Sequence, residues 1–170
     1  MYESPEELIE LQHLLDASAA SAGPHMRGII TAERRLSAGQ LTDRLQGMVL
    51  LVLATVTADG RPLVGPVDGY FLHGRFHFTS GRTSVRMRHL ALRPSVSASH
   101  LPGEELAVTV HGRAQIFELS DAGGPELRQA MLDHYLPLQG PSFEDWLDSE
   151  DVLAGRIDAD KLFTFSLESG

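Results

Sequence analysis

The chain has 170 residues and a mass of 18.6 kDa, the usual size of one compact domain, and its 42% hydrophobic and 22% charged residues are typical of a globular protein. Lys and Arg total 14 against 23 Asp and Glu, so the formal net charge of −9 disfavours general binding to nucleic-acid phosphates. Cysteine is absent, which excludes a disulfide framework, a thiolate metal site and a Cys nucleophile.

The first residues carry helix signals. Ser4 can cap a helix, Pro5 suits its first position and Glu7 can reach back to the cap. An apolar stripe follows at helical spacing and predicts a face that packs on the domain. Its members are Leu8, Ile9, Leu11, Leu14 and Leu15. The N-terminus is acidic where a secretory signal would be basic, so we expect a cytoplasmic protein.

Small residues lead to Gly23-Pro24, where regular structure is expected to end. Ser37 and Gln40 then predict a second helix, closed by Gly47. Residues 1–47 are interpreted as a helical segment that packs on the rest. Residues 48–57 form the most apolar run, but they fall short of the roughly 18 residues of a membrane span, so no membrane association is expected.

From Met48 to Leu119 the sequence changes to short runs rich in Val, Leu, Thr and Phe, which predicts strands joined by tight turns. Asp59-Gly60 favours a hairpin because both residues tolerate positive φ. A short helix over residues 82–92 interrupts the strands, and Gly112 is a candidate bend in the last one. The expected strands are Val49–Thr57, Arg61–Leu72, Arg75–Ser80, Pro94–His100 and Glu105–Leu119.

Two side chains in these strands have predicted environments. Phe76 and Phe78 alternate with Arg75 and His77, so His77 is expected to face solvent or a subunit interface. Asp68-Gly69 is interpreted as a turn; the alternative is a break inside a long strand, where Asp68 could polarise a ring nitrogen of a ligand.

The remainder predicts a helix, an acidic stretch and a last strand. Apolar residues at periods three and four indicate a helix from Pro125 to about Tyr135. Acidic residues over 144–151 indicate a solvated face, with a flap over a pocket as the alternative. In Lys161–Leu167, alternate residues face opposite ways, as in a strand. This order favours a small barrel over residues 48–170, within one domain overall, rather than a doubly wound sheet.

The positive charge is concentrated in one region. The chain has 13 Arg and one Lys, and five of the arginines lie between positions 75 and 93: Arg75, Arg82, Arg86, Arg88 and Arg93. A loop over Ser80–Ser84 would direct backbone N–H groups, hydroxyls and a helix dipole at one place, which suits a phosphate. The alternative is a solvated helix face whose Arg stems cover apolar surface. The spacing favours neither interpretation over the other.

Six segments in order resemble one family. They are LATV at 53–56, DGRP at 59–62, GPV at 65–67, FHFTS at 76–80, RMRHL at 86–90 and RPSVS at 93–97. Together they resemble the pyridoxamine 5′-phosphate oxidase-like flavin-binding split β-barrel family over about residues 48–118, and residues 161–167 resemble its last strand. The resemblance implies a mainly β, six-stranded antiparallel split β-barrel with flanking helices.

The resemblance also implies a homodimer with a flavin or deazaflavin at the subunit interface. Residues 65–67 and 78–80 would border the ring system and ribityl chain of the cofactor, and Arg86 and Arg88 would bind its phosphate. The implied cofactor-binding residues are Gly65, Pro66, Val67, Phe78, Thr79, Ser80, Ser84, Arg86, Arg88 and His89. Relatives often have Lys at the Arg86 position and Asn at the His89 position, so the geometry of these two contacts differs.

Vitamin B6 oxidation itself is not expected. The true pyridoxamine phosphate oxidases carry a tryptophan-containing segment and a late Arg-aliphatic-His element. Here the one tryptophan, Trp146, lies in FEDWLD, and the chain ends in FTFS without Arg or His.

Other sites have weaker signals. His73, His77, His100 and His111 occur singly on or beside the expected strands, without the paired spacing of a metal site, so no dedicated metal site is expected. No Gly-x-Ser-x-Gly element supports a hydrolase.

The sequence therefore favours a cytoplasmic homodimer that binds FMN and passes a hydride to or from a small organic substrate, with no side chain assigned as catalytic. One alternative is a reductase that uses the deazaflavin coenzyme F420. Another is a non-catalytic carrier or sensor of flavin or haem on the same fold.

Overall fold

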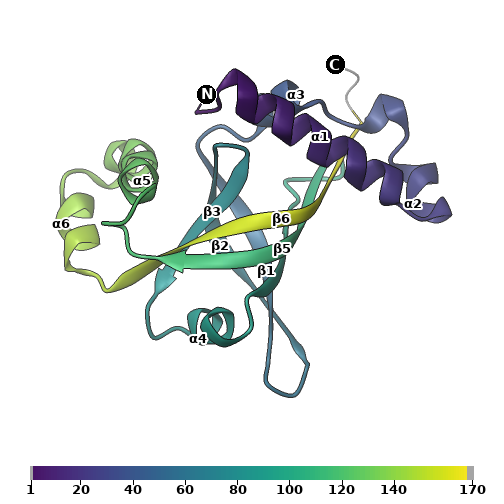
Figure 1. Cartoon of the computed structure of the whole chain (residues 1–170). Helices are drawn as coiled ribbons and strands as arrows, with labels where there is room; N and C mark the ends of the chain where they lie inside the picture. Colours follow the sequence, from purple (N-terminus) through teal and green to yellow (C-terminus); the bar gives the residue numbers. More distant parts are fainter. Residues whose placement is uncertain (1, 168–170) are drawn as a thin grey trace.

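The computed structural model describes residues 2–167, and its strands pair antiparallel in the order β1-β2-β3-β6-β5-β4, with β4 returning to β1 to close a barrel (Figure 1). The strands are β1 (Met48–Val56), β2 (Pro62–Leu72), β3 (Arg75–Gly81), β4 (Ser95–His100), β5 (Leu106–Phe117) and β6 (Val152–Ser166). The helices are α1 (Pro5–Ser21), α2 (Pro24–Ile29), the 3-10 helix η1 (Ala32–Arg34), α3 (Ala38–Arg44), α4 (Val85–Leu92), α5 (Gly124–Gln139) and α6 (Ser142–Ser149). The predicted six-stranded antiparallel split β-barrel with flanking helices is confirmed.

The barrel interior is filled by alternate side chains of its strands. In β1, Leu51 and Leu53 face the interior while Leu50 and Val52 face outward. Phe78 of β3 lies inside as predicted, and Gly155 of β6 passes directly against its ring, where a Cβ would collide. Glycine at this position lets the strand and the ring approach closely.

Strand β5 bends where the sequence indicated. Its pairing with β6 shifts register between His111 and Gly112, and a Cβ on Gly112 would overlap the backbone of Asp158. The shift lets β5 pair with β4 on one edge and with β6 along its whole length.

Strand β6 is longer than predicted. The prediction of Lys161–Leu167 captured only its second half, in which Leu162, Thr164 and Ser166 are buried on one face as expected. The first half also pairs with β3. It carries Arg156 and Asp158, which bond to each other at 2.9 Å on the outside of the barrel, so it lacks the apolar signal of a strand.

The N-terminal helices begin where predicted. In α1, the Ser4 amide donates to Glu7 Oε2 and the Glu7 amide donates to Ser4 Oγ, and Ser37 and Gln40 form the same capping box at α3. Of the predicted apolar stripe, Leu11 and Leu15 are buried and Ile9 is exposed. Gly23-Pro24 ends α1, but a short helix, α2, begins at once.

Helix α1 lies along β6 (Figure 1). The Leu162 amide donates to the buried Ser18 hydroxyl at 2.9 Å, and Leu41 and Leu45 share one apolar cluster with the barrel interior. No helix in residues 2–167 is long and apolar enough to cross a bilayer.

A second apolar cluster lies outside the barrel, where side chains of α5 and α6 pack on Tyr70 and Leu72 of β2 and on Ala154 of β6. The prediction that His77 faces solvent is wrong, because the residue is only 6% exposed, with its ring against Phe117 of β5, and burial lowers its pKa to about 4. The turn predicted at Asp68-Gly69 is also wrong, since both residues lie within β2.

His73 joins these layers across the β2–β3 turn. Its φ of 53° and that of 70° at Gly74 form a tight turn, and the ring reaches Glu7 of α1 at 3.0 Å and Glu126 of α5 at 2.7 Å. A ring that donates to two carboxylates carries both protons. Burial opposes this charge, but the hydrogen bonds and charges of Glu7 and Glu126 outweigh it and raise the pKa of His73.

Replacing His73 by Asn, which tolerates the positive φ, should remove this pH-dependent contribution. Because the pKa of His73 is higher in the folded than in the unfolded protein, protonation of His73 stabilises the fold. This stabilisation is complete below the unfolded-state pKa of about 6.5 and is lost as pH rises through the folded-state pKa. The wild type should therefore exceed His73→Asn in free energy of unfolding by about 0.5–1 kcal/mol at pH 6, with the margin shrinking by pH 8. Urea unfolding at both pH values measures the margin, and a margin independent of pH contradicts the assignment.

Candidate functional site

The five arginines of residues 75–93 differ in whether their side chains are paired with other groups of the protein. Arg82 pairs with Glu118 at 2.8 Å and Asp151 at 2.6 Å, Arg75 lies 3.7 Å from Asp158, and Arg93 donates to the Val56 carbonyl at 3.0 Å. Within residues 2–167, Arg86 and Arg88 pair with no carboxylate. These two therefore remain as cations available to an anion.

Helix α4 positions both residues. Ser84 caps it by accepting a hydrogen bond from the Met87 amide at 3.3 Å, and the buried side chains of Met87 and Leu90 anchor it on the barrel. Residues two apart on a helix leave it on different sides. Arg86 is directed to β2, and Arg88 is exposed with no side-chain hydrogen bond among the described residues.

The guanidinium of Arg86 is held by the middle of β2 and by the end of β3. It donates to the Pro66 carbonyl at 3.1 Å and to Ser80 Oγ at 3.4 Å, and Ser80 in turn donates to Ser84 Oγ at 3.0 Å. Partial burial lowers the pKa of Arg86 from its ordinary value, but a guanidinium stays protonated at neutral pH. The result is a half-buried positive charge beside two hydroxyl groups.

A cavity of about 240 Å³ lies next to this charge. Gly65 gives it room, because a Cβ there would stand 3.0 Å from the Arg86 Nη2 atom. His89 lies nearby, with Nδ1 3.1 Å from the buried hydroxyl of Thr55. The lining residues are Leu53, Thr55, Leu63, Val64, Gly65, Ser84, Val85 and Arg86.

The predicted site residues are only partly brought together. Gly65, Ser84 and Arg86 line the cavity, with Pro66 and Ser80 bonded to Arg86. Val67 and Phe78 direct their side chains into the barrel interior, so only their backbone can border a ligand. Thr79 is half-buried opposite Ala154 in the β3–β6 pair.

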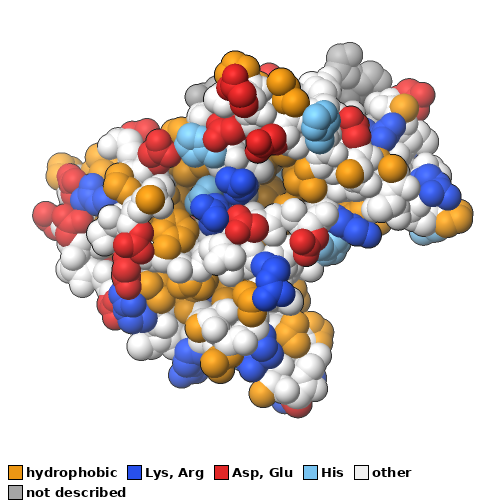
Figure 2. Space-filling model, viewed as in Figure 1, with side chains coloured by type: hydrophobic (Ala, Val, Ile, Leu, Met, Phe, Trp, Pro, Cys, Tyr) orange, Lys and Arg blue, Asp and Glu red, His pale blue; other side chains and the backbone are white. Residues whose placement is uncertain are grey.

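An exposed apolar face adjoins the cavity. Outward-facing residues of β1 and β2 form it, with Leu50 58% and Val64 59% exposed. We call Leu50, Val52, Val64 and Pro66 the β1–β2 face; in register, Val52 lies opposite Pro66. Figure 2 shows hydrophobic and basic side chains side by side around α4, at the bottom of the view. A surface of this kind is typical of a binding interface.

Tyr135 and Asp68 form a polar pair that the sequence did not indicate. The Tyr135 hydroxyl donates to Asp68 Oδ2 at 2.5 Å, and burial together with this hydrogen bond raises the pKa of Tyr135 to about 12. Asp68 faces outward from β2, two residues beyond Pro66 of the β1–β2 face. Alternation along β2 could have placed Asp68 on that face, but nothing local indicates Tyr135 as its partner.

The fold is shared with known structures at low sequence identity. HutZ, the haem storage protein of Vibrio cholerae, has a TM-score of 0.61 at 20% identity over 76% of this chain and 94% of its own. A provisionally named pyridoxamine 5′-phosphate oxidase of Listeria innocua has a TM-score of 0.56 at 14% identity, over 73% of this chain and 91% of its own. A FAD-binding protein of Mesorhizobium loti has a TM-score of 0.55 at 21% identity, over 79% of this chain and 98% of its own.

No protein-family model and no curated protein matches the sequence. The structural likeness shows the fold, and it confirms the fold implied by the resemblance to the pyridoxamine 5′-phosphate oxidase-like proteins.

Replacing Ser84 by Ala removes the α4 cap and the acceptor for Ser80. We expect the free energy of unfolding to fall by about 1 kcal/mol, as for other N-cap hydroxyls. Thr83→Ala is the matched control, because the exposed Thr83 makes no side-chain hydrogen bond among the described residues and its loss should be near neutral. Denaturant unfolding of both variants tests this, and equal effects would mean that Ser84 does not cap α4.

Proposed function

We propose that this protein is a flavin-dependent oxidoreductase that binds FMN with the cofactor phosphate beside Arg86. The observation that carries the proposal is the partly buried guanidinium of Arg86, which has no carboxylate partner among residues 2–167 and borders both a cavity and the β1–β2 face. The FAD-binding protein of the same fold supports a flavin as the class of cofactor.

The residues present fit a phosphate at this position. Arg86 can turn one edge of its guanidinium to two phosphate oxygens, and the Ser84 hydroxyl, which accepts from Ser80, can donate to another. The absence of a Cβ on Gly65 leaves space beside the guanidinium for the anion. Arg88 leaves α4 on another side, so its contribution is the smaller of the two.

When bound, FMN supplies a ring that takes up or releases a hydride. The chain binds and orients it, and the apolar side chains of Leu53, Leu63 and Val64 exclude water from the cavity. Backbone groups at Pro66, Val67, Phe78 and Thr79 border the ring and ribityl chain in this proposal. No side chain is assigned to proton transfer, and the substrate is a small organic molecule.

A second copy of the chain completes the site in this proposal. The cavity of about 240 Å³ is below the usual range of about 300–1,000 Å³ for ligand sites, and it opens beside the exposed β1–β2 face. A homodimer formed through this face would bury the apolar side chains and enlarge the site from the other side. We place this dimer in the cytoplasm, without a nucleic-acid partner.

Binding of FMN and riboflavin to the wild type and to Arg86→Gln tests the phosphate site. The wild type should prefer FMN, and Arg86→Gln should weaken FMN roughly tenfold to a hundredfold while leaving riboflavin unchanged, because bonds to charged groups contribute about 1.5–3 kcal/mol. Quenching of flavin fluorescence measures both affinities, and Arg88→Gln is the control with the smaller expected loss.

An equal loss for FMN and riboflavin would show that Arg86 does not hold the phosphate. Binding of coenzyme F420 in place of FMN identifies the deazaflavin variant of the proposal, which the absorbance spectrum distinguishes. If the loaded protein is not reduced by NAD(P)H or reduced deazaflavin, a carrier or sensor replaces the enzyme.

Haem is the second candidate, because one histidine has the geometry of a ligand. His100 Nδ1 lies 2.9 Å from the Leu50 carbonyl, which only accepts, so Nδ1 carries the proton and Nε2 is left to bind a metal. His100 ends β4 beside the β1–β2 face, and the haem storage protein of the same fold supports this class.

Haem binding through His100 predicts a Soret band that His100→Ala shifts or removes. His111→Ala is the control, since the His111 Nδ1 atom lies 2.8 Å from the Ser97 hydroxyl and no carbonyl fixes its tautomer. A Soret band unchanged in His100→Ala contradicts this ligand.

A further inference from the structure

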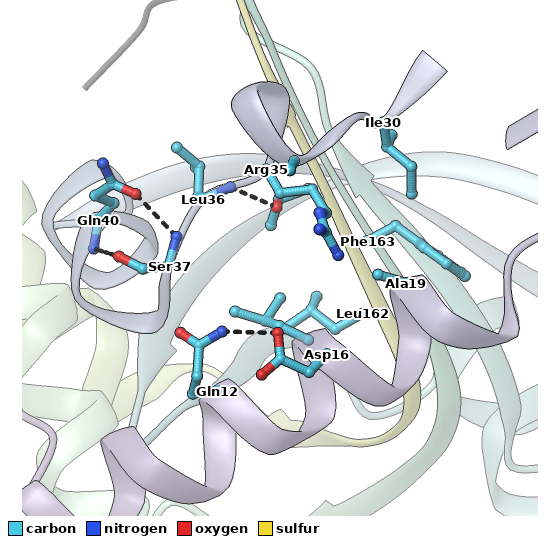
Figure 3. Close-up of a pocket in the computed structure, with 13 residues that line it drawn as sticks. Gln12, Asp16, Ala19, Ile30, Arg35, Leu36, Ser37, Gln40, Leu162 and Phe163 are labelled. Carbon is cyan, nitrogen blue, oxygen red and sulfur yellow. Dashed lines mark hydrogen bonds between the residues drawn. The ribbon is translucent and has the colours of Figure 1, made fainter. Parts of the chain in front are cut away.

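A separate cavity lies between the N-terminal helices and the barrel (Figure 3). It has a volume of about 220 Å³ and is bounded by α1, by the chain from Ile30 to Gln40 and by β6. The cavity lies on the opposite side of the barrel from α4, since α1 to α3 are at the top of Figure 1 and α4 is at the bottom. It is therefore distinct from the site beside Arg86.

The floor of this cavity is apolar. Leu15 of α1, Leu36 before α3 and Leu162 of β6 are all buried, and Phe163 forms part of the wall. Such a surface favours an apolar group of a ligand by removing it from water. The small volume excludes large cofactors, because ligand sites for drug-sized molecules measure about 300–1,000 Å³.

Most polar groups around the cavity already have partners within the protein. Gln12 accepts from the Ala38 amide at 2.8 Å and donates to Asp16 Oδ1 at 3.1 Å. Ser37 and Gln40 bond to each other's backbone in the α3 capping box, and Thr164 accepts from the Leu36 amide at 3.0 Å. These bonds fix the relative positions of α1, α3 and β6 around the cavity.

Two charged groups in the wall retain bonding capacity. The guanidinium of Arg35 has no hydrogen bond or ion pair within residues 2–167, and Asp16 has a second carboxylate oxygen that accepts from no described group. Figure 3 shows Arg35 on one side of the cavity and Asp16 on the opposite side, on α1. The two do not form an ion pair with each other, so the cavity has walls of opposite charge.

We propose that this cavity binds a small zwitterion with an apolar side chain, that is, an α-amino acid. The ligand carboxylate pairs with the Arg35 guanidinium, the ammonium group pairs with the Asp16 carboxylate, and the side chain lies on the floor formed by Leu15, Leu36 and Leu162. Both charges of the ligand are then matched across the cavity. The site is independent of the flavin proposal, because the two share no lining residue.

Calorimetric titration with three isosteric probes tests this site. L-Leucine carries both charges, leucinamide lacks the carboxylate and 4-methylpentanoate lacks the ammonium group. L-Leucine should bind, and each of the other probes should bind roughly five- to tenfold more weakly, since each loses one partly exposed charged contact. Failure of L-leucine to bind at millimolar concentration would overturn the proposal.

Two variants assign the contacts. Arg35→Gln should abolish the preference for L-leucine over leucinamide, and Asp16→Asn should abolish the preference over 4-methylpentanoate. Arg34→Gln is the matched control: it removes a neighbouring charge that lies over the Phe165 ring and outside the cavity lining, so both preferences should persist. Preferences that survive in Arg35→Gln and Asp16→Asn would overturn the assignment. FMN binding should be unchanged in every variant, which separates this test from that of the flavin site.

Discussion

The Arg86 guanidinium is a positive charge that the protein leaves without a negative partner in a partly buried position. It is held by a carbonyl of β2 and by a serine hydroxyl of β3, groups that orient it but do not neutralise it. The chain has a net charge of −9 and therefore an excess of carboxylates, and some of these form ion pairs with Arg75, Arg82 and Arg156. The desolvation of an unpaired cation is unfavourable, and an anion that binds beside it offsets part of this cost by electrostatic attraction.

Helices of this chain cover parts of the outer surface of the barrel, whereas the β1–β2 face is exposed among residues 2–167. Helix α1 lies against β6, and α5 with α6 packs on outward-facing side chains of β2 and β6. The β1–β2 face keeps its leucine and valine side chains in solvent, next to the cavity at Arg86. The same side of the barrel therefore combines exposed apolar side chains with the Arg86 charge. A partner surface would bury the apolar side chains, and a bound anion would pair with the charge.

The sequence was most informative where signals are local. The two capping boxes depend on neighbours within four residues, and both were predictable, as was the burial of Phe76 and Phe78 in β3. His77 packs against Phe117 of β5, which lies forty residues later in the chain, and Arg82 forms ion pairs with Glu118 and Asp151 from two other segments. The first half of β6 was missed because Arg156 and Asp158, which are partly exposed and pair with each other, interrupt its apolar pattern. Local patterns thus predicted the short helix that Ser84 caps and that carries Arg86, whereas long-range contacts determine which of the neighbouring arginines are paired with carboxylates.

The position of β6 in the chain has a consequence for biosynthesis. This strand separates β3 from β5 in the sheet, although it follows both in the sequence, so the barrel stays open until residues 152–166 have left the ribosome. Until then the facing edges of β3 and β5 expose unpaired backbone groups, which are templates for pairing with other nascent chains. Closure also requires contacts between distant segments, which form slowly. The early helices α1 and α3 can fold during translation, but the surface they pack on is completed by the last strand.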